Sequence, residues 1–330
     1  MEYPSLDTPT AGATRFNTDS SQLEIYDGNQ WAEVLATSPE LQTGGTRGLY
    51  AGGTSSDVID YVNIASTGNA TDFGNLTKDR AESGGFSNRN RALWGGDSVP
   101  GSDNTIDYVT IASTGNATDF GDMVTGNAQG MGGLANATRG LWGGGYQGGV
   151  INIMQYVTID TTGNAVDFGD LVTAFSGPAG GSSPTRGLWI GGSTPTKQNT
   201  ITYITIATTG NSSDFGDMNN TDSNGTAAGN AVRQVFFTGG SKNNIMEYIT
   251  TATLGNALDF GDMSIQRYSA SSNASPTRAT VGGGNGPSGT DSIDYVQIMT
   301  AGNAIDFGNL NASRAYLMKG CFSNGHGGLG

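Results

Sequence analysis

The chain has 330 residues with a formal net charge of −14, and 54 of them are glycine. An acidic surface repels phosphate backbones and anionic lipid headgroups, which argues against nucleic-acid binding and membrane-surface binding. No apolar run approaches the roughly 20 residues that span a bilayer, so no membrane insertion is expected. The opening letters, MEYPSLDTPT, lack the basic and apolar parts of a secretory signal.

Residues 1–42 differ from the rest of the sequence and are predicted to form a small β-hairpin module. Within 8–34, the segments RFNTDSS and LEIYDGNQW read as two strands joined by a turn, with a second turn at Asp27-Gly28.

From residue 43 to residue 330, a unit of about 47 residues recurs six times. Its marker is the phenylalanine of a DFG triplet, and a tyrosine precedes that phenylalanine by 12 or 13 positions. The phenylalanines are Phe73, Phe120, Phe168, Phe215, Phe260 and Phe307, and the tyrosines are Tyr61, Tyr108, Tyr156, Tyr203, Tyr248 and Tyr295. Such a period indicates a repeat architecture.

Each unit reads as four short strands, with no helical periodicity. In the order b, c, d and then a of the next unit, examples are RGLW, IDYVTIA, ATDFGDM and RAESGGFSN. A Gly-Asn pair between c and d predicts a two-residue hairpin turn of type II′. Strand c is apolar on both faces, so its sheet must be covered on both sides. We therefore predict an all-β fold, a six-bladed β-propeller with four-stranded blades behind the N-terminal hairpin.

The two ends of the repeat array predict how the ring closes. The first unit begins at strand b, and the segment 314–324 after the last unit aligns with a strand a. We expect this segment to pair with the first unit's strand b, because closure removes exposed sheet edges.

The residues just described resemble two known patterns. The glycine pairs that end strand b, such as Gly143-Gly144 and Gly191-Gly192, with the downstream tyrosine, are similar to kelch propellers, although strand d carries Phe where that family has Trp. The N-terminal segment resembles a module of bacteriophage tail-fibre and other virion proteins. The residues that match it are Arg15, Phe16, Asn17, Thr18, Leu23, Glu24, Tyr26, Asp27, Gly28 and Trp31. This resemblance implies a virion component, in which residues 1–42 would be the module that attaches the chain to the particle.

Two charged positions recur once per unit and are interpreted as structural. They are Arg47, Arg91, Arg139, Arg186, Arg233 and Arg278, and Asp72, Asp119, Asp167, Asp214, Asp259 and Asp306. We hypothesise that each arginine pairs with one of these aspartates and ties a blade together. No cofactor is expected, with calcium at the DFGD turns as the alternative. The single cysteine, Cys321, is interpreted as a small buried thiol, and the single histidine, His326, as part of a flexible tail.

The b–c links vary in length and content between units, which is typical of a binding surface on a rigid scaffold. The candidate ligand-binding residues, most of them in these links, are Asp97, Asp103, Tyr146, Gln147, Lys197, Lys242 and Asp291. No catalytic or metal-binding residue is predicted.

The leading functional hypothesis is a non-enzymatic bacteriophage virion protein, a decoration protein or a host-surface adhesin, located in the virion. Its expected partners are other tail or capsid proteins, further copies of the same chain, and a host surface glycan. The alternatives are a carbohydrate-binding, lectin-like propeller and, with less support, an enzyme that degrades polysaccharide.

Overall fold

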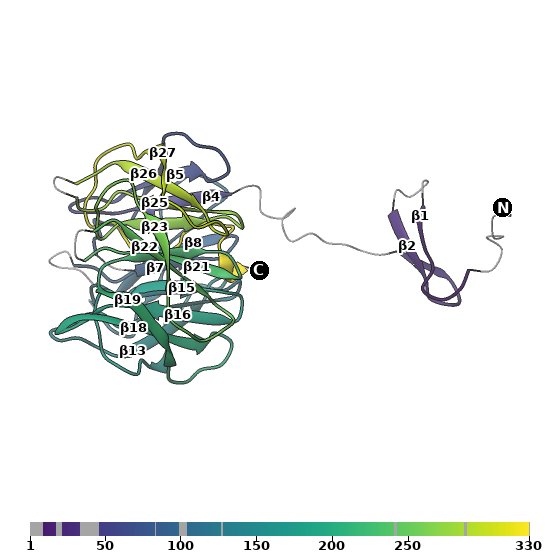
Figure 1. The fold of residues 1–330 in the computed structure, drawn as a ribbon, viewed down its shortest axis with the longest axis horizontal. Coiled ribbons are helices and arrows are strands. Elements are labelled where there is room, and N and C mark those ends of the chain that lie inside the picture. The colour runs from purple at the N-terminus through teal and green to yellow at the C-terminus, as the bar shows by residue number, and fades with distance from the viewer. Residues whose placement is uncertain are drawn as a thin grey trace. The chain divides into compact units, whose positions relative to one another are not determined.

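The computed structural model describes residues 9–17, 22–33, 46–82, 84–98, 104–126, 128–240, 243–286 and 289–329. The chain divides into two compact units, Met1–Gly44 and Gly45–Gly330. The predicted boundary, between residues 42 and 43, lies two residues before this division. Figure 1 shows both units, with the N-terminal strands in purple. The described residues contain no helix with the length and apolarity of a membrane span.

The described residues of the N-terminal unit form a sheet of three antiparallel strands, one more than the predicted hairpin. They are β1 (Thr14–Asn17), β2 (Gln22–Tyr26) and β3 (Trp31–Glu33). Arg15 Nε donates to Glu24 Oε2 over 2.7 Å, and the Arg15 guanidinium lies 4.3 Å from the centre of the Trp31 ring. The Asp27 carboxylate closes the β2–β3 turn by accepting the backbone N–H groups of Asn29 and Gln30.

The second unit contains six successive antiparallel sheets, one for each sequence repeat. Repeat 2 shows the pattern, with strands a, b, c and d in the order predicted: β7 (Gly84–Ser87), β8 (Arg91–Gly95), β9 (Thr105–Thr110) and β10 (Thr118–Asp122). Repeat 1 has β4 (Arg47–Ala51), β5 (Val58–Asn63) and β6 (Thr71–Asn75). Repeat 3 has β11 (Gly132–Ala135), β12 (Arg139–Gly143), β13 (Ile153–Thr158) and β14 (Val166–Asp170).

The remaining repeats follow the same order. Repeat 4 has β15 (Ala179–Ser182), β16 (Arg186–Ile190), β17 (Ser193–Thr194), β18 (Thr196–Thr205) and β19 (Ser213–Asp222). Repeat 5 has β20 (Thr226–Gly229), β21 (Arg233–Phe237), β22 (Ile245–Thr250) and β23 (Leu258–Asp262). Repeat 6 has β24 (Ser271–Ala274), β25 (Arg278–Gly282), β26 (Ser292–Gln297) and β27 (Ile305–Asn309), and the 3-10 helix η2 (Gly327–Leu329) follows it.

The predicted set of six uniform four-stranded blades is therefore only partly matched. The described residues form seven sheets, one of them in the N-terminal unit, and those of repeats 1 and 4 have three and five strands. Repeat 4 gains its extra strand because its b–c link pairs with the extended start of β18. The coarser prediction, an all-β fold of repeated antiparallel sheets in a propeller-like arrangement, is confirmed.

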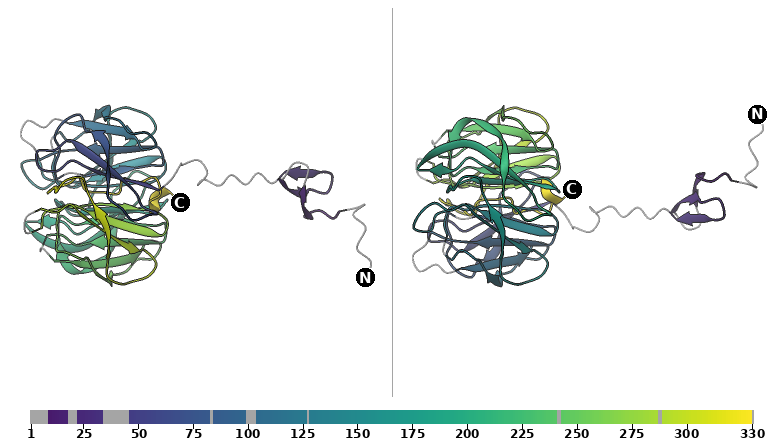
Figure 2. Two further views of the ribbon diagram at one scale, coloured as in Figure 1. Left: turned by 90° about the horizontal axis from the view of Figure 1, so that it is seen from above. Right: turned by 90° about the horizontal axis from the view of Figure 1, so that it is seen from below.

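The hydrophobic core lies between neighbouring repeats rather than inside any one sheet. One apolar cluster joins each pair of neighbours, and the sixth joins the first repeat to the last: Tyr50 and Ile64 pack with Ile293 and Phe307. In Figure 1, β26 and β27 accordingly lie beside β4 and β5, and Figure 2 shows the same unit from two opposite sides. A sheet covered on both faces explains why strand c is apolar on both sides.

The repeated TGNA phrase does not form the predicted type II′ hairpin turn, and that prediction was wrong. Seven residues separate β5 from β6, and the phrase binds strand d of the preceding repeat instead. Gly68 N–H donates to Phe307 O over 2.8 Å, and the Asn69 side chain accepts the Asn309 N–H over 3.1 Å. All six repeats make both bonds, so each phrase links its repeat to the preceding one, and repeat 1 to repeat 6.

The DFG triplet forms a β-bulge at this seam. The pairing of β10 with β9 shifts between Asp119 and Gly121, which leaves Phe120 unpaired and buried. The following glycine must stay small because a Cβ on Gly74 would lie 2.4 Å from the Gly115 carbonyl oxygen of the next repeat. The triplet is thus structural, as its repetition predicted.

The hypothesised pairing of repeated arginines with repeated aspartates is wrong. The aspartates are exposed on strand d, whereas each arginine donates to a carbonyl after strand c of the next repeat, as Arg47 does to Ile111 O over 2.8 Å. Each guanidinium also stacks on the repeat's tyrosine, 4.0 to 4.8 Å from the ring centre. The flat cation fits this site because it combines hydrogen bonding with ring stacking.

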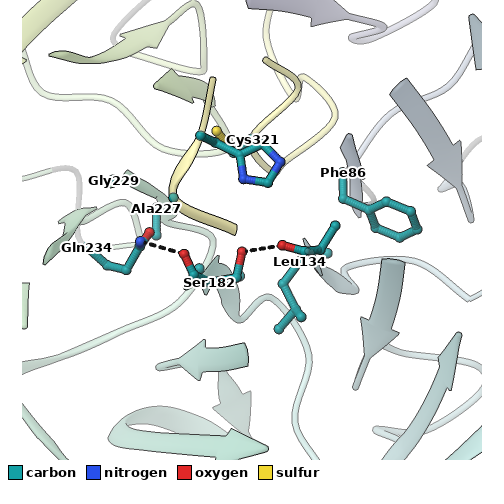
Figure 3. A pocket seen from close by; sticks show the side chains of 13 residues that line it. Phe86, Leu134, Ser182, Ala227, Gly229, Gln234 and Cys321 are labelled. Atoms are coloured by element: carbon teal, nitrogen blue, oxygen red, sulfur yellow. Dashed lines mark hydrogen bonds between the residues drawn. The ribbon is translucent and has the colours of Figure 1, made fainter. Parts of the chain in front are cut away.

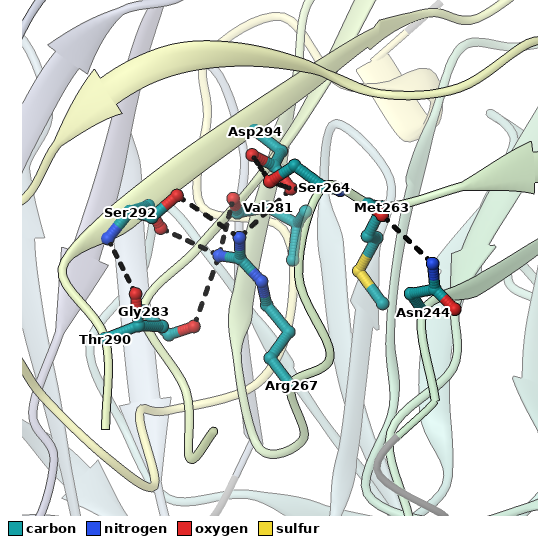
Figure 4. A network of polar contacts seen from close by, with 9 residues as sticks. All are labelled: Asn244, Met263, Ser264, Arg267, Val281, Gly283, Thr290, Ser292 and Asp294. Atoms are coloured by element: carbon teal, nitrogen blue, oxygen red, sulfur yellow. Dashed lines mark hydrogen bonds and ion pairs between the residues drawn. The ribbon is translucent and has the colours of Figure 1, made fainter. Parts of the chain in front are cut away.

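Buried ion pairs lie elsewhere, between strand c and the link that precedes strand a. Arg267 Nη2 lies 3.0 Å from Asp294 Oδ2, and both side chains are almost fully buried. Figure 4 shows Arg267 also bonded to Ser292 O, while Ser264 donates to the carboxylate of Asp294. Repeats 1 and 2 carry the equivalent pairs Arg314–Asp60 and Arg80–Asp107.

The other three repeats lack both members of this pair. The corresponding link and strand c residues are Ala128 and Gln155, Phe175 and Thr202, and Asp222 and Glu247. Arginine and aspartate are thus present together or absent together, and the half-ring of repeats 6, 1 and 2 contains all three pairs.

The segment after repeat 6 fills the centre of the unit, and the predicted regular strand at 314–324 is not formed. Leu49 N–H donates to Phe322 O over 3.2 Å, and Met318 N–H donates to Ala51 O over 3.1 Å. The segment therefore lies beside β4, as predicted. It forms no continuous ladder because it also makes bridges to Gly84 and Ser272, in two other repeats.

The end of the chain is packed, so the prediction of a flexible tail at His326 was wrong. The His326 Nε2 atom lies 2.6 Å from Ser87 O, and Nδ1 accepts the Gly328 N–H. Burial lowers the pKa of this imidazole to about 4. Cys321 is half-buried beside a cavity of about 10 Å³, which Figure 3 shows between Phe86 and Ser182. The centre of the second unit is therefore filled at this level.

Candidate ligand site at the mouth of the axis

The links between strands b and c and those between strands d and a meet on one face of the second unit. Backbone bridges join the two kinds of link in three repeats, namely Gln129 to Tyr146, Ser176 to Ser193, and Tyr268 to Asn285. In repeat 2, Ser98 N–H donates to Ala81 O in the same way. The variable b–c links therefore lie beside the d–a links.

A closed ring of backbone hydrogen bonds surrounds the axis on this face. One residue in each d–a link, two positions before strand a, has a positive φ between 50° and 71°. These residues are Glu82, Gly130, Gly177, Asn224, Ser269 and Tyr316. Each carbonyl accepts an N–H from the next link: Gly130 N–H donates to Glu82 O over 2.6 Å, and Glu82 N–H donates to Tyr316 O over 3.1 Å.

Four of these six positions carry side chains although the conformation favours glycine. A non-glycine residue in the left-handed region costs about 1–2 kcal/mol. Such positions cluster at functional sites when the surrounding structure holds them in place. The ring therefore marks the mouth of the axis as the candidate site.

The half of the ring between Glu82 and Asn224 is hollow. A pocket of about 210 Å³ opens there, because the ring positions at Gly130 and Gly177 have no side chains to fill it. It is lined by Glu82, Gln129, Gly130, Tyr146, Ser176, Gly177 and Asn224. On the other half, the rings of Tyr268 and Tyr316 occupy the space, with centres 5.8 Å apart and hydroxyl oxygens 3.1 Å apart.

A buried lysine fixes one wall of the pocket. Lys319 Nζ donates to Asn224 Oδ1 over 3.2 Å, and its side chain is only 1% exposed. Burial lowers the pKa of Lys319 to about 8, against the opposing effect of the Glu82 and Asp222 carboxylates. Because a cation occupies Oδ1, the Asn224 amide can offer its Nδ2 donor to a ligand.

Of the predicted ligand-binding residues, the structure brings only Tyr146 into the pocket, where it is 43% exposed. The Asp97 carboxylate is buried and accepts the Ala81 N–H, and Gln147 donates to Gly126 O over 2.6 Å. Lys197 Nζ bonds to Gly240 O. Asp291 is exposed and does not line the pocket. Asp103 and Lys242 lie outside the described residues.

Sequence reasoning missed Glu82, Gln129, Ser176 and Asn224, because it looked mainly in the b–c links. The available signal for Glu82 and Asn224 was variation at one register of the d–a links, which two repeats fill with glycine and the other four with glutamate, asparagine, serine and tyrosine. Once the strands are placed, this register is found by counting two residues back from the start of each strand a.

Acidic groups do not gather into a metal site among the residues that the structure describes. The most perturbed carboxylate is Asp222, whose pKa burial raises to about 6. It accepts the N–H groups of Gly239 and Gly240 over 2.7 and 2.8 Å, bonds that oppose this rise. Asp222 therefore holds the b–c link of repeat 5 rather than a cation.

Comparisons with known proteins bear on the fold. No protein-family model matches the sequence, and no curated protein matches it. A solved structure titled "Structure of YjhT" has a TM-score of 0.59 and 10% sequence identity, covering 72% of this chain and 86% of that chain. At this identity, the likeness shows a β-propeller-like fold alone.

Proposed function

We propose that this chain is a non-enzymatic bacteriophage virion protein, a host-surface adhesin built as a six-bladed, kelch-like β-propeller behind an N-terminal attachment module. The resemblance of residues such as Arg15, Phe16 and Trp31 to a fibre-protein module supports the virion assignment. The division into two compact units supports separate attachment and binding parts. The partners would be other virion proteins and further copies of the chain.

The observation that carries the binding role is the hollow at the mouth of the axis. The seams between repeats use the same bonds six times, whereas the links on this face differ in every repeat. A rigid scaffold with divergent loops is the usual arrangement of a binding surface. We propose that the ligand is a host surface glycan, because the lining combines an exposed aromatic ring with hydrogen-bonding side chains.

The pocket supports binding better than glycoside hydrolysis. Most glycosidases need two carboxyl groups on opposite sides of the scissile bond. Glu82 provides the one carboxylate in the lining of this pocket. The repeated aspartates are exposed on the outer strand d, one in each repeat.

Measurements on purified particles and on the purified chain test this proposal. Gold-labelled antibodies against the second unit should decorate purified particles, and mass spectrometry of the particles should detect the chain. Purified full-length chain should bind host cells and compete with particle adsorption. Absence from the particle with retained glycan binding would favour the lectin alternative. Release of sugar from host polysaccharide by the purified chain would contradict the non-enzymatic assignment.

A further inference from the structure

We propose that the hollow at the axis mouth binds one neutral pyranose ring of the glycan, stacked on Tyr146. This inference rests on the proposed function and names the chemistry of its site. No other aromatic side chain lines the hollow, and Tyr146 is substantially exposed there. A volume of about 210 Å³ lies below the roughly 300–1,000 Å³ of pockets that enclose drug-sized ligands, so it suits a single sugar ring.

The polar groups of the lining match sugar hydroxyls. The side chains of Glu82, Gln129 and Ser176 line the hollow, and no hydrogen bond joins them to another described residue. A carboxylate accepts from two hydroxyls, an amide both donates and accepts, and a serine hydroxyl does either. Lys319 occupies Oδ1 of Asn224, so the Nδ2 group of Asn224 adds a further donor. The hollow therefore presents donors and acceptors on several sides of Tyr146.

The charges select a neutral ligand. The Glu82 carboxylate lies in the wall, and the chain carries a net charge of −14, so an acidic sugar would be repelled. The ammonium of Lys319 is buried and already bonded to Asn224, so it is not free to pair with a ligand carboxylate. A quaternary ammonium ligand would need a cage of several rings, but Tyr268 and Tyr316 contact each other on the opposite half of the ring.

The backbone explains why this half of the ring can admit a ligand. Gly130 and Gly177 occupy the ring positions between Glu82 and Asn224, with φ of 67° and 71°. Because glycine serves at these two positions, the ring of backbone hydrogen bonds forms without a side chain there. The side chains of Glu82 and Asn224 therefore stand at the two ends of the hollow without being required for the backbone bonds.

Isothermal titration with the full-length chain tests the inference. The probes are the methyl glycosides of glucose, galactose, mannose and N-acetylglucosamine, with glucuronic acid and choline as charged comparisons. We expect at least one neutral glycoside to bind and both charged probes to fail. Tyr146→Ala should weaken binding by about fivefold or more, because the stacking contact with the ring is lost. Tyr146→Phe should stay within about threefold, because it keeps the ring.

Further variants separate direct contact from unfolding. Glu82→Gln should weaken binding about fivefold or more by removing one acceptor. Val166→Ala, at an exposed position on strand d, is the matched control and should bind like the parent chain. Thermal unfolding of every variant confirms that the fold is kept.

Three results would overturn the inference. They are binding of glucuronic acid or choline in preference to neutral glycosides, full binding by Tyr146→Ala, and no binding of any neutral glycoside. If the chain still adheres to host cells in the last case, the adhesin proposal survives and its contact lies elsewhere. If the chain binds neither cells nor sugars, both proposals fail.

Discussion

Replacing Asp294 tests the reasoning about buried ion pairs most directly. In Asp294→Asn, the Arg267 guanidinium would remain almost fully buried without its counter-charge. Removing one partner of such a pair costs about 3–5 kcal/mol, because a buried charge is left uncompensated. That loss is a large part of the 5–15 kcal/mol that typical domains have.

Another repeat of the same chain shows how both charges can be replaced together. Repeat 3 has Ala128 and Gln155 at the positions of Arg267 and Asp294, and Gln155 accepts the Val124 N–H over 2.7 Å. Arg267→Ala combined with Asp294→Gln transfers this arrangement to repeat 6. We expect the double variant to lose only about 1–3 kcal/mol, most of it from the cavity that the arginine leaves.

Guanidinium denaturation followed by tryptophan fluorescence gives these free energies of unfolding by linear extrapolation. Asp259→Asn, at an exposed aspartate of β23, is the control and should change stability by less than about 0.5 kcal/mol. The reasoning is refuted if the double variant loses as much stability as Arg267→Ala and Asp294→Gln lose in total when each is made alone. It is also refuted if Asp294→Asn matches the control.

Three further predictions concern the axis and the seams. The pKa of His326 is lowered from 6.5 to about 4 in the folded state, so its neutral ring stabilises the fold fully above pH 6.5. This stabilisation amounts to about 3 kcal/mol and is lost as the pH falls from 6.5 to 4. In denaturation at several pH values, His326→Gln should make the free energy of unfolding less dependent on pH between 4 and 6.5. Removing residues 318–330 deletes Met318 and Phe322, which are fully buried and each stabilise the fold by about 1.5–3 kcal/mol. The truncated chain should therefore show no cooperative melting transition in calorimetry. A sharp transition at the parent temperature would contradict this. Asn164→Ala removes the acceptor of the Asp122 N–H and should cost about 1 kcal/mol in denaturation, whereas an unchanged midpoint would show that the seam bond contributes nothing.

The strands could be predicted from the sequence because each repeat carries its own alternation and turn residues. Strands b, c and d appear where RGLW, IDYVTI and TDFGD predicted them. The c–d connection was predicted wrongly because a Gly-Asn pair between two strands is also typical of a local hairpin. Its true partner belongs to another repeat, and no local pattern reveals a bond from Gly68 to a carbonyl 239 positions later.

The candidate site could be predicted only in part. Tyr146 could be predicted as a ligand-binding residue because an aromatic side chain in a glycine-rich link has no hydrophobic core to pack into, and it is exposed in the structure. Glu82 and Asn224 give no such local signal, because their register beside Gly130 and Gly177 is recognised only after the strands of the repeats have been aligned. The buried arginine–aspartate pairs could be recognised because each repeat has either both residues or neither, but this pattern appears only after the strands have been aligned.

The last residues of the described chain hold a position that affects biosynthesis. Residues 318–329 contact strands a and b or the turns beside them in all six repeats. During translation the earlier repeats leave the ribosome with this interior still unfilled, and exposed sheet edges promote misassembly. Repeats that emerge before residue 318 is translated would therefore lack the segment that fills this interior, and the edge of β4 would be unpaired.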